Sequence, residues 1–554
     1  MPSAFAIVAR RPALVTGLVI FVAAAALRLS LVETARFTGD EARDYATGMD
    51  IAHGVRFPAL GPAIAGSSAC CLPGPLYNWM AAAPQLVTRA PEAGNVFFEL
   101  LGAATVWMFW FGLRRPFGER AAAFAGMLMA LSPWSALFGD RVWNPHAFLF
   151  FEMLALLSVL RLRDEPRSRW AIVFPIACLA LPQLHLAAPI VWLALLPLAL
   201  GNIRLWHRRY LALGTVLGLA LYIPFVIHEA KTGFAVTRVV LNLSTNAASG
   251  AKSNFYLAPI YVLRLLTLDV TYHELTGYWG GLDESAAWRT LWLGSAARPF
   301  HVLRLVALLS SLLLLASAVA AAVVSVARRM RGHGHGHGHG HGHGHGHGHG
   351  HGHGHGHGHG HGKEQGRPFG AFAWSAAIAL AADMTLLAMT GTKVFANYVT
   401  PVFPFVFVVF AHLAATALQG SSVWARRFAT AIVVLALIVC VGGVEATLSI
   451  SRRIDGRNGL AVHRAVARRV LDDCAAAGRA PQACPARLDL GFFGLNYSHA
   501  IFARHALPVP VRWERSPSGS SFAYRLQKRE DPPPPEAAAF PVTRVGVVSL
   551  YRLR

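Results

Sequence analysis

Apolar stretches long enough to cross a lipid bilayer recur along most of this chain of 554 residues. One crossing by an α-helix takes about 20 mostly apolar residues. With 54% hydrophobic and only 14% charged residues, the composition excludes a soluble globular protein. We therefore predict an all-α polytopic membrane protein with about 11 transmembrane helices. The predicted helices cover residues 13–32, 95–113, 120–138, 147–161, 170–184, 186–200, 210–228, 301–327, 369–389, 396–418 and 428–448.

Basic residues gather in the short connections that these helices place on one side of the membrane. An excess of Lys and Arg marks cytoplasmic loops, so this distribution puts the N-terminus in the cytoplasm and the segment after about residue 449 outside. It also explains the net charge of +22 without nucleic acid as a partner. The clusters are Arg10-Arg11, Arg114-Arg115 with Arg120, Arg161/Arg163/Arg167/Arg169, Arg204/His207/Arg208/Arg209, Arg328/Arg329/Arg331 and Arg426-Arg427.

The segments left outside hold most of the carboxylates that do not end a helix, so we expect the chemistry there. They divide the chain into a transmembrane module, residues 1–448, and an extracytoplasmic C-terminal part, residues 449–554. Strand-like stretches at 487–493 and 542–548 predict a small mixed α/β domain in that part. Cys474 and Cys484 in the same part are candidates for a disulfide. The outer segments are 33–94, 139–146, 229–300, 390–395 and 449–554.

An acidic pair opens the first outer segment. Thr38 to Glu41 matches a capping box, which predicts a helix from there to about His53 whose apolar side rests on the membrane. Asp40 has little structural reason for its place and is our candidate general base, whereas Glu41 is either a helix cap or a second catalytic group. Asp44, one turn on, is a second ligand or a solvated charge. A base at lipid-headgroup depth suits an enzyme that acts on a lipid phosphate.

Short motifs then follow in a fixed order along residues 13–418. Arg28 ends the first helix, where an internal ion pair with Asp40 or Asp140 is expected. After Asp40-Glu41 come Pro73-Gly74-Pro75-Leu76-Tyr77, Ser132-Pro133-Trp134, Arg141-Val142-Trp143-Asn144-Pro145, Leu184-His185, and Tyr398-Val399-Thr400-Pro401-Val402-Phe403-Pro404. In their order and placement these motifs resemble the GT-C superfamily of polytopic glycosyltransferases. The resemblance is to bacterial members like family 39, which are related to protein O-mannosyltransferases and to the lipid A aminoarabinose transferase.

The resemblance implies that a sugar passes from a polyprenyl-phosphate carrier to an acceptor hydroxyl at the outer face of the bacterial inner membrane, with inversion of the anomeric centre. The acceptor is a glycan, a lipid or a protein. Asp40 would be the base on that hydroxyl, and Glu41 would position the acceptor or assist. The leaving phosphate calls for nearby cations. The candidate substrate-binding residues are Arg43, Asp44, Tyr77, Asp140, Arg141, Lys393 and Tyr398.

A divalent metal is an open question, and no other cofactor is expected. Some members of the superfamily hold a metal with Asp-x-Asp in the first loop, but this chain reads Asp-Glu-Ala-Arg-Asp from Asp40. His146 and His185, with Asp140, are weak candidate ligands, since a lone histidine at a helix end is usually only hydrogen-bonded.

Fifteen His-Gly pairs occupy residues 332–362 and form a flexible linker on the predicted cytoplasmic side. They are either an expanded repeat without a role or a metal sensor, and a polytopic transporter is the other alternative to an enzyme. Deleting Gly332–Gly362 separates the enzyme from the metal sensor, because sugar transfer should survive the deletion.

Overall fold

A computed structural model gives the architecture of the chain. It describes residues 12–35, 37, 39–63, 71–132, 135–136, 142–239, 258–259, 261–262, 367–390, 396–420, 422–453, 459–476, 478, 486–489, 522–528, 542–545 and 548–552. The predicted helix at 301–327 and the His-Gly tract lie outside these residues, as do Thr38, Asp140, Arg141 and Lys393.

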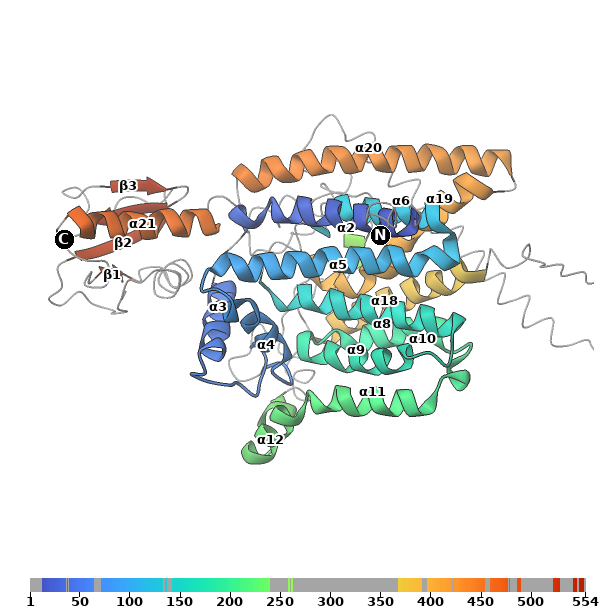
Figure 1. The fold of residues 1–554 in the computed structure, drawn as a ribbon, viewed down its shortest axis with the longest axis horizontal. Coiled ribbons are helices and arrows are strands. Elements are labelled where there is room, and N and C mark those ends of the chain that lie inside the picture. The colour runs from blue at the N-terminus through green and yellow to red at the C-terminus, as the bar shows by residue number, and fades with distance from the viewer. Residues whose placement is uncertain are drawn as a thin grey trace, which may run out of the picture.

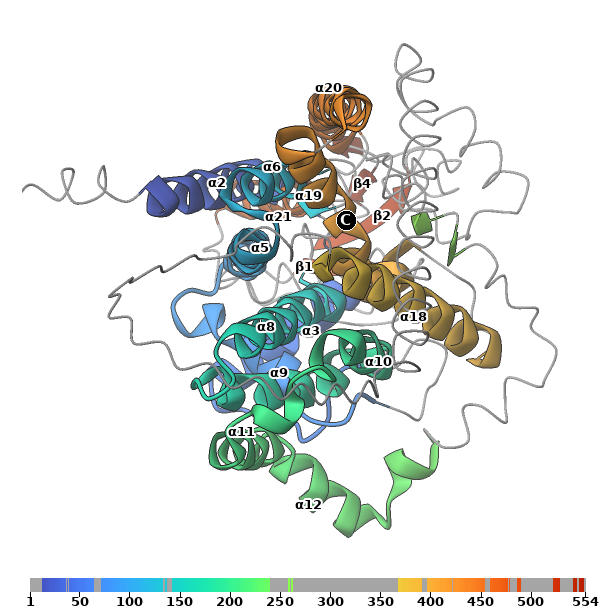
Figure 2. The ribbon, with the colours of Figure 1, turned by 90° about the vertical axis from the view of Figure 1, so that its right-hand side faces the viewer.

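Long apolar helices pack side by side into one bundle (Figure 1), which Figure 2 shows nearly end-on. Helix α2 packs on α5 and α6, α8 packs on α5 and α9, and α19 packs on α6 and α20. Their buried apolar side chains join in one continuous core. The bundle helices are α2 (Pro12–Leu29), α5 (Pro91–Phe117), α6 (Glu119–Leu131), α8 (Asn144–Asp164), α9 (Trp170–Leu184), α10 (Ala188–Ala199), α11 (Arg208–Ala220), α18 (Arg367–Thr390), α19 (Phe403–Gln419) and α20 (Val423–Arg453), and α12 (Ile223–Thr232) extends from α11 away from them.

These helices match the predicted ones closely where the structure describes them, with two differences. Residues 210–228 form two helices, because α11 and α12 meet at a bend of 51°. Pro224 explains the restart, since proline fits the first turn of a helix but cannot continue one. Helix α6 ends at Leu131, because Ser132 precedes Pro133 and takes an extended conformation (φ −62°, ψ 125°).

Exposed apolar side chains identify the surface that faces lipid. Among the residues described, six helices are long and apolar enough to cross a membrane, and the bent α11–α12 pair would make a seventh. Helices α9 and α10 are apolar but shorter. The chain is therefore a multi-pass membrane protein, and the number of eleven crossings stays a prediction. Exposed apolar residues include Leu14, Leu18 and Val22 of α2, Leu213 and Val216 of α11, and Trp424 and Leu437 of α20.

Three of the connections with clustered arginines meet at one end of the bundle, namely those after α5, after α8 and before α11. Arg115, at the end of α5, pairs with Asp164 and Glu165 after α8 at 2.8 and 2.9 Å. The backbone N–H of His207 donates to the Pro166 carbonyl at 3.2 Å and brings the start of α11 to the same place. We call this the basic end.

Short helices collect at the opposite end, which we call the α3 end. They are η1 (Val32–Thr34), α3 (Gly39–Ala52), α4 (Leu76–Ala82), η2 (Pro84–Leu86) and η6 (Ala396–Val402), while η3 (Ile203–Leu205) follows α10. In Figure 1 α3 and α4 lie below one end of α5, and α21 (Leu460–Ala476) lies beyond the same end of the bundle. Segments that the sequence places outside the membrane thus lie together.

The C-terminal part combines α21 with a four-stranded sheet. Strands β1 (Ala486–Asp489), β2 (Phe522–Lys528), β3 (Val542–Val545) and β4 (Val548–Arg552) lie in the order β1-β2-β4-β3. The β1–β2 pair is parallel and the other two pairs are antiparallel. Both predicted strand-like stretches therefore contain strands. Helix α20 runs to Arg453, five residues past the predicted end of the transmembrane module. Cys484 lies outside the described residues, so the disulfide stays a prediction.

Candidate active site

Helix α3 carries the acidic pair and begins where the sequence predicts, at Gly39. Asp40 and Glu41 lie in its first turn, and the helix ends at Ala52, one residue before the predicted end. The capping box itself stays a prediction, since Thr38 is not among the described residues. Helix α4 crosses α3 closely at Gly48, where a Cβ atom would lie 2.7 Å from the Ala81 carbonyl oxygen. Only glycine permits this approach, which brings Tyr77 of α4 to the polar face of α3.

Four side chains from α3 and α4 form one connected cluster, the Asp40–Tyr77 cluster (Asp40, Arg43, Asp44 and Tyr77). Arg43 Nη1 donates to Asp40 Oδ1 at 2.9 Å, and Arg43 Nη2 lies 2.9 Å from Asp44 Oδ1. The Tyr77 hydroxyl donates to Asp44 Oδ2 at 2.9 Å. Arg43 therefore bridges the carboxylates of Asp40 and Asp44, and Tyr77 fixes the carboxylate of Asp44 with a hydrogen bond.

One side of the cluster is exposed to solvent and the other side is buried. The Asp40 side chain is 39% exposed and that of Arg43 is 36% exposed, whereas that of Asp44 is 2% exposed. Burial raises the pKa of Asp44 to about 7, although the positive charge of Arg43 and the hydrogen bond from Tyr77 act against the shift. Burial, and then the charge of Asp44, raise the pKa of Tyr77 well above its usual 10. Tyr77 therefore remains a proton donor to Asp44.

The pKa of Asp44 predicts a measurable pH dependence of stability. The unfolded chain releases this proton near pH 4 and the folded chain near pH 7, so in between the folded state binds more protons. The free energy of unfolding therefore falls as the pH rises from about 4 to about 7, by about 4 kcal/mol at most. Thermal unfolding of wild type and Asp44→Asn across this range should show wild type losing stability relative to the variant. Parallel curves would contradict the burial of this carboxyl.

Glu41 lies on another face of α3 and is enclosed by protein. It is 3% exposed, in contrast to its neighbour Asp40. Of the predicted acidic pair, Asp40 is therefore the carboxylate that a substrate in solution or at the membrane surface can reach. Glu41 fits a supporting place better than direct contact with an acceptor.

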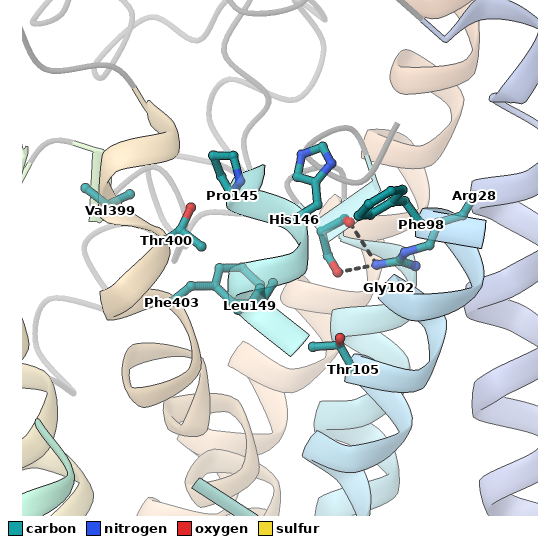
Figure 3. Close-up of a pocket in the computed structure, with 11 residues that line it drawn as sticks. Arg28, Phe98, Gly102, Thr105, Pro145, His146, Leu149, Val399, Thr400 and Phe403 are labelled. Atoms are coloured by element: carbon teal, nitrogen blue, oxygen red, sulfur yellow. Dashed lines mark hydrogen bonds between the residues drawn. The ribbon is translucent and has the colours of Figure 1, made fainter. Parts of the chain in front are cut away.

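A partly open hollow lies beside the cluster at the α3 end. Figure 3 shows Phe98, His146, Thr400 and Phe403 around it, with Arg28 at one wall. The ring of Phe98 also contacts the ring of Tyr77, with centroids 5.9 Å apart. Phe98 thus lines the hollow and also contacts the Asp40–Tyr77 cluster.

Arg28 is buried in the wall of this hollow and ties three segments together. Its Nη1 donates to the carbonyls of Ala24 and Ala130, at 3.2 and 3.3 Å, and its Nη2 donates to the Ser135 carbonyl at 2.8 Å and to the Ser135 hydroxyl. Its Nε has no hydrogen-bond partner among the described residues. Of the two expected partners of Arg28, Asp40 pairs with Arg43 instead, and Asp140 lies outside the described residues, so that pairing stays a prediction.

The Pro-Gly-Pro-Leu-Tyr motif fixes the start of α4 against α9. Gly74 has a φ of +114°, and a Cβ atom there would lie 2.3 Å from Gln183 Oε1. The backbone N–H of Leu76 donates to the same Gln183 oxygen at 3.2 Å. Glycine is required at position 74 for both its backbone conformation and this close approach. The motif therefore serves to place Tyr77, the next residue of the helix.

The two histidines proposed as weak metal ligands have other surroundings. His185 Nδ1 accepts the backbone N–H of Ala187 at 3.2 Å at the start of α10, and its ring lies 6.3 Å from that of Tyr398. The ring of His146 packs edge-on against Trp143. Within the described part of the chain, no three His, Cys, Asp or Glu residues gather closely enough to hold a metal ion.

The structure brings together Asp40, Arg43, Asp44 and Tyr77 of the predicted site residues. Tyr398 lies outside this cluster, in η6, whose residues Val399 and Thr400 line the hollow. Phe98 and the C-terminal helix were not predicted to be parts of the site. No local motif marks them, since each acts through a contact with a residue distant in sequence.

Comparisons with known proteins give one family model that matches part of the chain and solved structures that are similar over most of it. Residues 73–228 match the model of a family described as dolichyl-phosphate-mannose-protein mannosyltransferase; this range contains Tyr77 but not α3. The solved structure of ArnT from Cupriavidus metallidurans in the apo state is similar, with a TM-score of 0.52 and 13% identity, over 97% of this chain and 98% of that chain. ArnT bound to undecaprenyl phosphate gives a TM-score of 0.50 with the same identity and coverage.

A third solved structure, the oligosaccharyltransferase of Archaeoglobus fulgidus in its apo form, has a TM-score of 0.43 and 14% identity, over 89% of this chain and 64% of that chain. No curated protein sequence matches the chain. At 13% identity the ArnT structures establish a shared fold across nearly the whole chain.

Proposed function

We propose that this chain is a glycosyltransferase of the GT-C superfamily that transfers a lipid-linked sugar. Its partial match to a protein mannosyltransferase family model and the fold that it shares with ArnT support the proposal. The donor is a sugar linked to a polyprenyl phosphate, and the acceptor is a hydroxyl group of a glycan, a lipid or a protein. The reaction takes place at the α3 end, which faces the outside of the bacterial inner membrane. The arginines at the opposite, basic end support this orientation.

The observation that carries the proposal is the graded burial of the Asp40–Tyr77 cluster. A transferase of this kind needs an accessible base beside a cation that faces the leaving phosphate. Asp40 is the half-exposed carboxylate, and Arg43 is the half-exposed cation next to it. The buried Asp44, which accepts a hydrogen bond from Tyr77, also pairs with Arg43. The guanidinium therefore stays in place when its contact with Asp40 is broken.

The chemistry follows from these positions. The acceptor oxygen attacks the anomeric carbon of the donor from the face opposite the phosphate, while Asp40 takes the proton of the acceptor hydroxyl. The bond between the anomeric carbon and the phosphate oxygen breaks, and the polyprenyl phosphate leaves with the bonding electrons. Arg43 donates to the phosphate as negative charge develops on it. When Arg43 turns to the phosphate, Asp40 loses its ion pair and becomes a stronger base.

The hollow beside Phe98 suits the lipid end of the donor. Its walls combine apolar side chains such as Phe98, Leu149 and Phe403 with the hydroxyl of Thr400 and the charge of Arg28. We assign it to the carrier's first isoprenoid units, with the phosphate between this hollow and Arg43. Among the residues outside the described part, Arg141 and Lys393 remain proposed phosphate ligands and Asp140 a proposed substrate contact.

Binding of the carrier alone tests this donor class without knowledge of the sugar. Protein in lipid nanodiscs is heated with polyprenyl phosphate or with polyprenol of the same chain length. Both lipids have the same apolar tail, so a difference between them reports the phosphate group. Polyprenyl phosphate should therefore stabilise wild type more than polyprenol does. Arg43→Ala should lose this preference. Arg56→Ala should keep it, since Arg56 pairs with Asp50 at 2.8 Å near the other end of α3. Equal stabilisation of wild type by both lipids would refute a phosphate site.

A further inference from the structure

We infer that the C-terminal helix α21 is a positioning element for the proposed base: it holds α3, and the chain leading into it, in register with the bundle. Arg464 is its main positioning residue. The inference rests on the proposed function in that the group positioned is Asp40. It concerns a helix that begins 420 residues after Asp40 and that the proposed reaction does not itself use.

The backbone and aromatic contacts of α21 lie directly before α3. The backbone N–H of Leu460 donates to the Ala35 carbonyl at 3.1 Å. The ring of His463 packs edge-on against Phe37, with centroids 5.3 Å apart, and both side chains are buried. Asp40 follows Phe37 by three residues. Ala35 and Phe37 belong to the short connection between η1 and the first turn of α3. Helix α21 therefore contacts this connection directly before α3.

Helix α21 also contacts the apolar face of α3, which lies away from Asp40. Asp40, Arg43 and Asp44 are spaced by three and four residues and share one face of the helix. Ala42, Tyr45 and Met49 share the other face and are buried with Leu460 and Ala467 in one apolar cluster. The expectation that this apolar side rests on the membrane is wrong, because α21 and Phe37 occupy it. Packing of α21 and Phe37 against this face therefore contributes to the position of the polar face, together with the packing of α4 on α3.

Arg464 joins three elements with one side chain. It pairs with Glu33 of η1 at 3.2 Å and with Glu92 in the first turn of α5. Exposed ion pairs add little to stability by themselves. An arginine that bridges two carboxylates on different elements, however, fixes a geometry as well as a distance. Arg464 thus sets the position of α21 against the bundle helix α5 and against the chain that enters α3.

The test uses the full-length protein in lipid and two readouts. Hydrogen exchange of the amides in residues 39–52 reports the order of α3 directly. Turnover of the lipid-linked donor reports the position of Asp40, since a displacement of about 1 Å can lower a rate by about 100-fold. For Arg464→Ala we expect faster exchange in α3 and a kcat lowered by about 10-fold or more, with the donor KM little changed. Arg464→Lys, which keeps the charge, should recover part of the kcat.

The matched control is Arg468→Ala, which removes an exposed arginine one turn further along the same helix. It should leave both readouts at the wild-type level. Leu460→Ala, which weakens the apolar contact instead of the ion pairs, should act in the same direction as Arg464→Ala and provides a second variant if the first folds poorly. Unchanged exchange in α3 in both Arg464→Ala and Leu460→Ala would overturn the inference, as would faster exchange with unchanged kcat. If wild type transfers no sugar, the proposed function fails, while the exchange comparison still decides whether α21 orders α3.

Discussion

Replacing Asp40 by asparagine should lower the rate of sugar transfer by a factor of about 10² to 10⁴, the usual contribution of a general base. Asparagine keeps the size and the first-turn position of Asp40 but cannot take a proton from the acceptor hydroxyl. Because the side chain is half-exposed and its ion pair with Arg43 lies at the surface, the loss of stability should stay below about 1 kcal/mol. Binding of the polyprenyl phosphate should persist, since Arg43 remains in place.

The same substitution at Asp50 provides the control for Asp40→Asn. Asp50 lies on the same helix and also pairs with an arginine, Arg56, at 2.8 Å, but it lies outside the Asp40–Tyr77 cluster. Asp50→Asn should transfer sugar at the wild-type rate. If a folded Asp40→Asn protein matches wild type, Asp40 acts only at the start of the helix and the assignment of the base is wrong.

Removing Arg43 should affect both activity and stability. Arg43→Ala takes away the donor to the leaving phosphate, for which we expect a loss of about 10² to 10³ in kcat. It also leaves the buried Asp44 carboxylate without its cation. Since Arg43 is about one third exposed, we expect the free energy of unfolding to fall by about 1 to 3 kcal/mol at pH 8. The stability loss should shrink at pH 5, where Asp44 is protonated.

A double variant separates the two roles of Arg43. Arg43→Ala with Asp44→Asn removes the unpaired buried charge, so thermal stability should return most of the way to that of wild type. Activity should stay as low as in Arg43→Ala, because no donor faces the phosphate. Recovery of activity together with stability would mean that Arg43 is purely structural. Arg43→Lys should be intermediate, as an ammonium group cannot bridge two carboxylates in the way a guanidinium does.

The sequence predicts the bundle well because spans are coded locally. Each needs only a long apolar stretch, and the break between α9 and α10 at Pro182 to His185 is visible in the chain itself. The bend between α11 and α12 was missed, although Pro224 marks it. Proline near the start of a helix and proline inside a helix look alike until the preceding turn is known.

The candidate site could be predicted only in part, for a related reason. Asp40, Arg43 and Asp44 are neighbours on one helix face, so their spacing shows that they meet. That Asp44 is buried depends on Tyr77, whose approach requires Gly48 and Gly74 in two different segments. Of the two predictions for Asp44, a solvated charge is wrong, because the side chain is 2% exposed and pairs with Arg43, and its role as a ligand stays a prediction. Similarly, the buried residues of α21 follow a helical period, but nothing in that period shows that α3 is their partner.

The most direct test of the account is turnover by the purified wild-type protein in lipid. The protein is given a panel of lipid-linked sugars together with membrane extract as the source of acceptors, and the release of polyprenyl phosphate is followed with time. We expect release from one class of donor, dependent on the acceptor extract, with the sugar recovered on a new hydroxyl in the opposite anomeric configuration. If folded protein releases polyprenyl phosphate from none of the donors while the acceptor extract is present, the proposed sugar transfer is wrong.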